Sequence, residues 1–215
     1  MKSVCVFCGS KEGKNPDFMS GARAMGEELA ARGLSLVYGG GTVGLMGAVS
    51  RAVVAGGGEV TGIIPRALAP REISGEMTGN TIFVSSMHER KAMMAEKSDC
   101  FVALPGGFGT FEELFEIITW LQLGIHNKPI GLLNIEGYYE PLLALVQRGY
   151  EQGFIGEEYK DMLVVADNAK DLLDGLERHQ PPPPMKNFDW KKKAEEEAEE
   201  EAKEEQPVHL SMKET

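Results

Sequence analysis

The chain has 215 residues, of which 42% are hydrophobic and 7% aromatic, enough to bury one substantial core in one domain or two small ones. Lys and Arg number 22 against 33 Asp and Glu, and the resulting formal charge of −11 argues against a general nucleic-acid-binding protein. Residues 194–205 carry eight Glu and one Lys, so the rest of the chain is only mildly acidic.

Hydrophobic runs and cysteines argue against a membrane or secreted protein. No apolar run approaches the roughly 20 residues that span a bilayer, and the first apolar run is too short for a signal peptide. Three cysteines without a secretory signal favour a reducing, cytoplasmic setting. Cys5 and Cys8 form a C-x-x-C within or just after an apparent strand, where we expect buried thiols rather than a redox pair or zinc site.

Strand-like and helical patterns alternate along most of the chain. Apolar runs predict strands at residues 4–8, 34–38, 59–64, 81–84, 100–104, 130–133 and 162–165. Helical patterns lie between them at residues 17–32, 45–55, 87–97, 111–123, 138–151 and 170–177. Continuous apolar strands separated by helices are typical of a parallel sheet covered on both faces, so we expect a doubly wound, Rossmann-like α/β fold.

The end of the chain departs from this alternation. We assign residues 1–180 to one nucleotide-binding α/β domain and residues 181–215 to a separate tail. Four prolines at residues 181–184 predict a stiff polyproline spacer. The acidic segment beyond has almost no apolar stripe, which predicts disorder or partial helix. Its charge could recruit a basic partner, although such runs are usually only solubilising.

Small residues follow three of the predicted strands. In open α/β sheets, loops at the carboxyl ends of the strands lead into helix N-termini, whose free N–H groups attract anions. Glycine lets the backbone approach such an anion closely. The turns therefore predict a phosphate site, with candidate contacts at Gly9, Ser10, Gly40, Gly41, Thr42 and residues 105–110.

Two other nucleotide motifs fit less well. Gly39, Gly41 and Gly44 satisfy G-x-G-x-x-G, and Glu59 follows at a distance not far from that of a ribose-binding acid. That dinucleotide fingerprint normally follows the first strand of its unit, whereas this turn follows the second. The P-loop pattern G-x-x-x-x-G-K-[ST] is absent, and the four histidines have no metal-ligand spacing. We expect neither a metal nor a cofactor.

A cation lies on the apolar face of the predicted helix at residues 87–97. Met87, Arg90 and Met94 share one face, so Arg90 is either a snorkelling or paired arginine or an anion contact at the sheet edge. Lys91 lies about 100° further round the helix. It either serves the same pocket or is solvated.

The predicted helix at residues 111–123 is apolar almost all round, so we expect it to be buried, including against a second subunit. Glu113 lies in line with Ile117 and Trp120, a costly position for an unpartnered carboxylate. Thr110 and Glu113 have capping-box spacing, which would place Glu113 back on the helix start. A carboxylate fixed beside a phosphate turn is also well placed for catalysis, and the two interpretations are compatible.

Three motifs together resemble the LONELY GUY family of cytokinin riboside 5′-monophosphate phosphoribohydrolases, whose members are often labelled lysine decarboxylases. The motifs are Gly39-Gly40-Gly41-Thr42-x-Gly44-Leu45-Met46-Gly47, Met87-His88-Glu89-Arg90-Lys91 and Pro105-Gly106-Gly107-x-Gly109-Thr110-x-Glu112-Glu113. The resemblance runs from about residue 2 to residue 177 and excludes the acidic tail.

The resemblance implies hydrolysis of the N-glycosidic bond in an N6-prenylated adenosine 5′-monophosphate, by a homodimer. It implies Arg90 and Glu113 as the catalytic pair, and Gly107, Gly109 and Thr110 around the phosphate. The further substrate-binding residues that it implies are Glu72, Lys91, Phe108, Phe111, Glu112 and Thr119.

Other activities are weighed against this one. A general hydrolase of AMP or other nucleoside 5′-monophosphates would share these motifs, and so would a non-catalytic nucleotide-binding protein. Lysine decarboxylation needs a Schiff-base lysine for pyridoxal phosphate and a larger scaffold. Lys91, Lys97 and Lys128 lack any recognisable context for that role.

Overall fold

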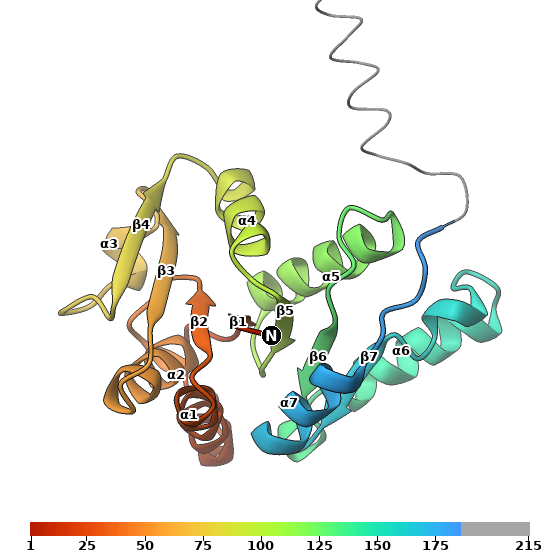
Figure 1. Ribbon diagram of the computed structural model, residues 1–215, viewed down its shortest axis with the longest axis horizontal. Helices are drawn as coiled ribbons and strands as arrows, with labels where there is room; N and C mark the ends of the chain where they lie inside the picture. The colour runs from red at the N-terminus through yellow and green to blue at the C-terminus, as the bar shows by residue number, and fades with distance from the viewer. Residues whose placement is uncertain (186–215) are drawn as a thin grey trace, which may run out of the picture.

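The computed structural model describes residues 1–185, which form a single sheet covered by helices on both faces (Figure 1). Every neighbouring pair of strands is parallel, and the seven strands follow the order β4-β3-β2-β1-β5-β6-β7. The strands are β1 (Ser3–Phe7), β2 (Ser35–Tyr38), β3 (Val60–Pro65), β4 (Asn80–Val84), β5 (Cys100–Ala103), β6 (Ile130–Leu133) and β7 (Leu163–Ala166). The doubly wound fold is confirmed, and each strand lies within one residue of its predicted bounds.

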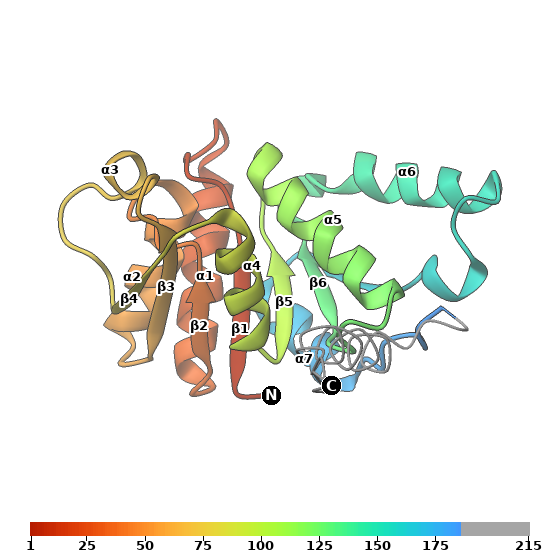
Figure 2. The same ribbon diagram turned by 90° about the horizontal axis from the view of Figure 1, so that it is seen from above.

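Helices form the outer layers, with α1, α2 and α7 on one face of the sheet and α4 and α5 on the other (Figure 2). The helices are α1 (Pro16–Ala31), α2 (Gly44–Ala55), α3 (Ala69–Glu72), α4 (Met87–Glu96), α5 (Phe108–Gln122), α6 (Glu140–Glu151) and α7 (Ala169–Arg178). Short α3 and the 3-10 turns Ile135–Gly137 and Glu157–Tyr159 were not predicted. The predicted helix at residues 111–123 begins three residues earlier, at Phe108.

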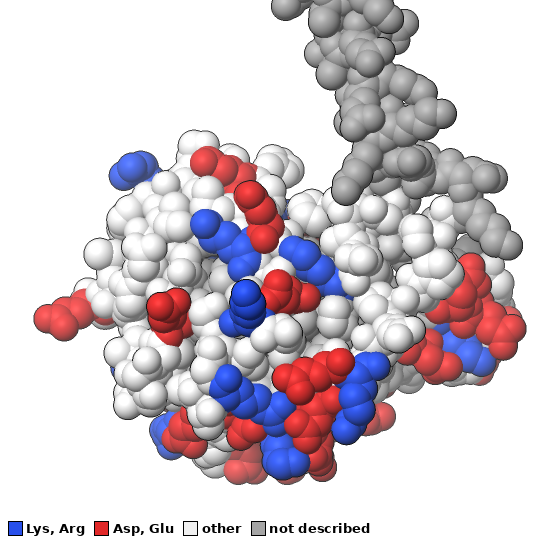
Figure 3. All heavy atoms as spheres, viewed as in Figure 1, with Lys and Arg blue, Asp and Glu red and all other residues white. Residues whose placement is uncertain are grey.

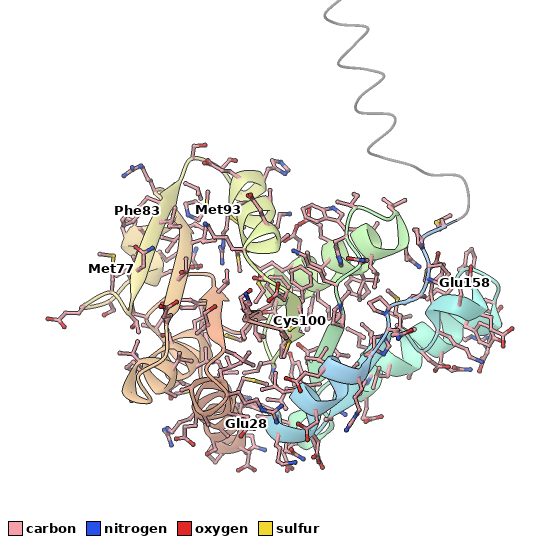
Figure 4. All side chains as sticks on the ribbon, viewed as in Figure 1. Glu28, Met77, Phe83, Met93, Cys100 and Glu158 are labelled. Carbon is pink, nitrogen blue, oxygen red and sulfur yellow. The ribbon has the colours of Figure 1, made fainter. Side chains whose placement is uncertain are left out.

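Alternating strand residues build a core on each side of the sheet. In β1, Val4 and Val6 face α1 and α2, whereas Cys5 and Phe7 face α4 and α5. All three cysteines are buried and unpaired, and Cys100, labelled in Figure 4, is the first residue of β5. Burial raises the pKa of the Cys5 and Cys8 thiols well above the usual range, as predicted for inert buried thiols.

The last helix is fixed to the first by a charged cluster, visible where α1 and α7 meet at the lower edge of Figure 3. Arg32 lies 2.8 Å from Glu28, 2.7 Å from Asp174 and 3.9 Å from Glu177. Because several carboxylates share one planar guanidinium, this cluster orders α7 more firmly than isolated surface pairs would.

The proline segment packs against the domain. Tyr159 Oη donates a hydrogen bond to the Pro183 carbonyl at 3.2 Å, and the Met185 N–H donates to the Gln122 carbonyl at 2.9 Å. The segment predicted as a stiff polyproline spacer is thus attached to the domain at these two points. The predicted acidic tail beyond residue 185 lies outside the described residues. None of the described helices is both long and apolar enough to cross a bilayer.

Candidate active site

A cavity of about 700 Å³ opens at the carboxyl ends of β1, β2 and β5, at the upper edge of the sheet in Figure 2. This volume lies in the range of small-ligand sites. Hydrogen bonds join its loops: the Gly9 N–H donates to the Pro105 carbonyl at 3.0 Å, and the Leu45 N–H donates to the Gly9 carbonyl at 3.0 Å. The turns after three separate strands therefore form one rigid rim.

Glycines allow these loops to touch. A Cβ on Gly9 would lie 3.3 Å from Gly106 Cα, and one on Gly44 would lie 2.4 Å from the Ser10 carbonyl carbon. Gly44 also has a φ of +57°, which other residues rarely adopt. These two contacts involve the turns after β1, β2 and β5, so the glycines here let the loops pack against one another.

Arg90 and Glu113 form a buried ion pair at the cavity. Their side chains come from α4 and α5, and Arg90 Nη2 lies 3.3 Å from Glu113 Oε1. Arg90 is 6% exposed and Glu113 is 7% exposed. Arg90 Nε has no hydrogen-bond partner, and Nη1 reaches only the Met87 thioether at 3.9 Å. Arg90 is therefore paired, as one of the two interpretations expected, yet keeps donors free for a ligand.

Glu113 does not cap its helix, so the predicted capping box is wrong. Gly107 is the N-cap of α5, with φ −105° and ψ −155° and no side-chain cap bond. Thr110 and Glu113 thus lie inside the helix, and the Glu113 carboxylate is too far along to reach the cap. The N–H groups in the first turn of α5 have no capping side chain, and residues 107–110 line the cavity. Free N–H groups at the start of a helix attract anions.

The electrostatics of Glu113 are those of a buried carboxylate among like charges. Burial raises the pKa of Glu113 to about 7, against the opposing effect of the Arg90 guanidinium. The nearby carboxylates of Glu112 and Glu72 add to this rise in pKa. A pKa near neutral is typical of groups that take part in acid–base catalysis, so Glu113 is a candidate for such a role.

Lys91 joins α4 to α5 and does not line the cavity. It is 8% exposed, and its Nζ donates hydrogen bonds to Glu112 and, at 2.9 Å, to Glu116. Burial alone would lower the pKa of Lys91, but the hydrogen bonds to the two carboxylates outweigh it and raise that pKa. Both earlier interpretations of Lys91, as solvated or as facing the pocket, are wrong for the single chain.

The structure brings most, but not all, of the expected residues together. Those that line the cavity are Gly9, Ser10, Glu72, Arg90, Gly107, Phe108, Gly109, Thr110, Glu112 and Glu113. Phe111 packs beside the cavity against Tyr138, and Thr119 is exposed further along α5, where its hydroxyl donates to the Phe115 carbonyl at 2.7 Å. Neither Phe111 nor Thr119 lines the cavity in the single chain.

The expected phosphate contacts at Gly40, Gly41 and Thr42 are likewise not at the cavity. Thr42 is buried, and its hydroxyl is engaged with the backbone of Ser74. The Thr42 N–H is also used within the protein, since it donates to the Glu72 carbonyl at 3.0 Å.

Other residues at the cavity were not among the site residues predicted from the sequence. A Cβ on Gly39 would lie 2.1 Å from Arg90 Nη2, so the absence of a side chain there makes room for the guanidinium. Tyr138 Oη donates to the Gly106 carbonyl and steadies the turn after β5. Arg71 and Lys11 add cations to the lining. Among residues 1–185, no group of three or more His, Cys, Asp or Glu could hold a metal ion.

Comparisons with known proteins identify the family of the chain. Residues 46–176 match the protein family described as "Possible lysine decarboxylase". The chain is 54% identical over 180 residues to the probable cytokinin riboside 5′-monophosphate phosphoribohydrolase LOGL2 of Oryza sativa subsp. japonica, covering 84% of this chain and 74% of that protein. It is 53% identical over 180 residues to the cytokinin riboside 5′-monophosphate phosphoribohydrolase LOG7 of Arabidopsis thaliana, covering 84% and 83%.

Solved structures share the fold at low identity. The molybdenum cofactor carrier protein of Chlamydomonas reinhardtii has a TM-score of 0.62 and 19% identity, over 82% of this chain and 96% of that chain. The molybdenum cofactor binding protein of Rippkaea orientalis has a TM-score of 0.61 and 20% identity, over 81% and 94%. The fold is thus shared widely, whereas the sequence identity to the plant proteins decides the family. The chain belongs to the LONELY GUY family of cytokinin riboside 5′-monophosphate phosphoribohydrolases.

Proposed function

We propose that this protein hydrolyses the N-glycosidic bond of N6-prenylated adenosine 5′-monophosphates, releasing the free base and ribose 5-phosphate. The observation that carries the proposal is the buried Arg90–Glu113 pair, 3.3 Å apart, beside the uncapped first turn of α5. The names of the plant relatives, more than half identical to this chain, support the same reaction.

The geometry suggests a division of labour. The phosphate binds at the backbone N–H groups of residues 107–110, remote from the bond that breaks, and this contact positions C1′. As the C1′–N9 bond breaks, its electron pair goes to the base and C1′ takes on oxocarbenium character. The Glu113 carboxylate stabilises that charge or orients the water that adds to C1′, and the proton that this water loses neutralises the leaving base. Arg90 uses its free donors on the leaving base or on the ribose phosphate.

A product assay tests the substrate class. The full chain is incubated with N6-isopentenyladenosine 5′-monophosphate, with its nucleoside and with AMP, and free base is followed by chromatography. We expect release mainly from the prenylated monophosphate. Release from AMP alone would keep the chemistry and reassign the protein to general nucleoside monophosphates. Release from none of the three would favour a nucleotide-binding protein.

We propose that the active form is a homodimer built on α5 and α6. No residue of α6 is buried, and Leu145 on it is 64% exposed. Phe115 on α5 is 42% exposed, and Phe154 just after α6 is 89% exposed. Large exposed apolar side chains gathered on neighbouring elements favour a protein–protein contact there. A second chain would also bring partners to Phe111 and Thr119, which lie off the cavity of one chain.

Light scattering of the purified protein should therefore give twice the mass of one chain. Leu145→Glu should shift the mass towards one chain, because a buried unpaired carboxylate opposes association. Leu34→Val in the core is the matched control, since Leu34 is 5% exposed and lies outside this surface. A wild-type mass of one chain would contradict the dimer.

Three free, buried cysteines support a reducing setting for this reaction. Disulfides are rare in such compartments, and pairing of neighbouring cysteines would be expected in an oxidising one. We therefore place the protein in the cytoplasm.

A further inference from the structure

Thr42 connects the glycine turn after β2 to the segment that follows α3. Its hydroxyl donates to the Ser74 carbonyl at 2.9 Å and accepts from the Ser74 N–H at 2.7 Å. Its own N–H donates to the Glu72 carbonyl at 3.0 Å. Thr42 is 5% exposed, so the three bonds join a buried residue to an outer segment of the chain.

The segment held in this way has few other attachments. Helix α3 is four residues long and has no buried residue. The N–H groups of Arg71, Glu72 and Ile73 donate to the carbonyls of Leu68 or Ala69, within the segment itself. The bonds from Thr42 are therefore what fixes residues 72–74 relative to the sheet.

The segment carries a carboxylate into the active-site cavity. Glu72 lines the cavity, and its Oε2 is inaccessible to water and has no hydrogen-bond partner. Glu113 lines the same cavity, and the charge of Glu72 contributes to the raised pKa of Glu113. A buried oxygen without a donor is costly, so it is suited to accept a hydrogen bond from a ligand hydroxyl or amino group.

Neighbouring residues also hold the turn that contains Thr42. Gly40 has a φ of +77°, and a Cβ on Gly47 would lie 2.1 Å from the Thr42 carbonyl oxygen. Arg51 Nη1 donates to that same oxygen at 2.9 Å. The glycine run and Arg51 thus form a rigid backbone support for Thr42.

We propose that Thr42, braced by Arg51, is a positioning residue that holds the Glu72 carboxylate against the nucleotide in the cavity. The proposal rests on the proposed function for its substrate, and it assigns the second glycine motif a role in place of phosphate binding. Thr42 itself does not touch the ligand. It acts by fixing the backbone on both sides of Glu72.

Thr42→Val removes both hydroxyl bonds and keeps the side-chain shape. With the prenylated monophosphate, we expect KM to rise about tenfold and kcat to stay within about twofold, because a binding contact is loosened while the Arg90–Glu113 pair is untouched. Thr42→Ser keeps the hydroxyl and should restore KM. In a Glu72→Gln background, Thr42→Val should change KM by less than about twofold further, since the contact it serves is already lost.

Hydrogen exchange of the Ser74 amide gives a readout that does not depend on activity. In Thr42→Val this amide should exchange faster, and in Arg51→Met it should exchange faster than in wild type. Arg23→Met is the matched control. Arg23 and Arg51 both line a groove between α1 and α2, and Arg23 has no hydrogen bond to Thr42. Arg51 is exposed, so its variant should fold even if Thr42→Val does not.

Unchanged exchange in both variants would overturn the proposal. Equal kinetic effects of Thr42→Val and Thr42→Ser would also overturn it. So would a double variant in which the increases in KM caused by Thr42→Val and by Glu72→Gln multiply in full. If wild type releases no base at all, the proposed function fails, and the exchange experiment still decides whether Thr42 fixes the segment.

Discussion

Glu113→Gln should lower kcat for base release by about 10² to 10³, because the amide cannot carry the charge that stabilises an oxocarbenium ion. The amide keeps the shape and one acceptor for Arg90, which lies 3.3 Å from the carboxylate in the wild type. The fold should therefore survive. Glu116→Gln is the matched control, one turn further along α5 and bonded to Lys91, and it should stay within a few-fold of wild type.

The pH profile identifies how Glu113 acts. Its pKa is about 7, and the ionised form is the active one in the proposed mechanism, so kcat/KM should rise about tenfold per pH unit below pH 7 and level off above it. This limb should be absent from the residual activity of Glu113→Gln. A rate that falls as pH rises through 7 would instead assign Glu113 to proton donation to the base.

The same shift in pKa predicts a stability change. The folded protein holds the Glu113 proton more tightly than the unfolded chain, whose pKa is near 4.5. The free energy of unfolding should therefore fall as pH rises from about 4.5 through 7, by about 3 kcal/mol at most. Urea unfolding at pH 5 and pH 8 would measure this fall, which Glu113→Gln should lack.

The fold could be predicted from the sequence because its signals are local and agree. Continuous apolar runs such as β5 and β6 are typical of strands buried on both faces, and helices of ten or more residues lie between them. Short α3 escaped prediction because four residues with no buried side chain carry no periodicity. The start of α5 was not predicted because its N-cap residue, Gly107, has no side chain that marks a helix start.

The site could be predicted only in part. The position of a motif in the sequence shows at which edge of the sheet it lies, but not which side chains it contacts. Arg90 and Glu113 were identified by their charge on apolar faces, and they meet at the cavity. Lys91 is the next residue after Arg90 on the same helix, yet its side chain pairs with two carboxylates of α5. Thr42 lies in a glycine turn like the others, but its partner is 32 residues away, which no local pattern reveals.

Gly39→Ala should remove activity by displacing Arg90 without replacing it. The new Cβ would lie 2.1 Å from Arg90 Nη2 and 3.2 Å from its Cζ, so the guanidinium must move. The backbone of Gly39 is not among the left-handed glycines, and the atoms in the way are the ends of flexible side chains. We therefore expect kcat to fall about 10²-fold, as misplacement of a reacting group by about 1 Å does. The free energy of unfolding should change by less than about 1 kcal/mol.

Two further measurements separate displacement from general damage. With the cation moved away, the pKa of Glu113 should rise further, so the pH limb of kcat/KM should shift to higher pH. Arg90→Met removes the same guanidinium, and adding Gly39→Ala to it should lower kcat by no more than about twofold further. Wild-type turnover in Gly39→Ala, or losses that multiply in the double variant, would contradict the idea that this glycine exists to make room for Arg90. Non-additive losses together with the shifted limb would instead tie the missing side chain of Gly39, in the turn after β2, to the charge state of the Glu113 carboxylate on α5.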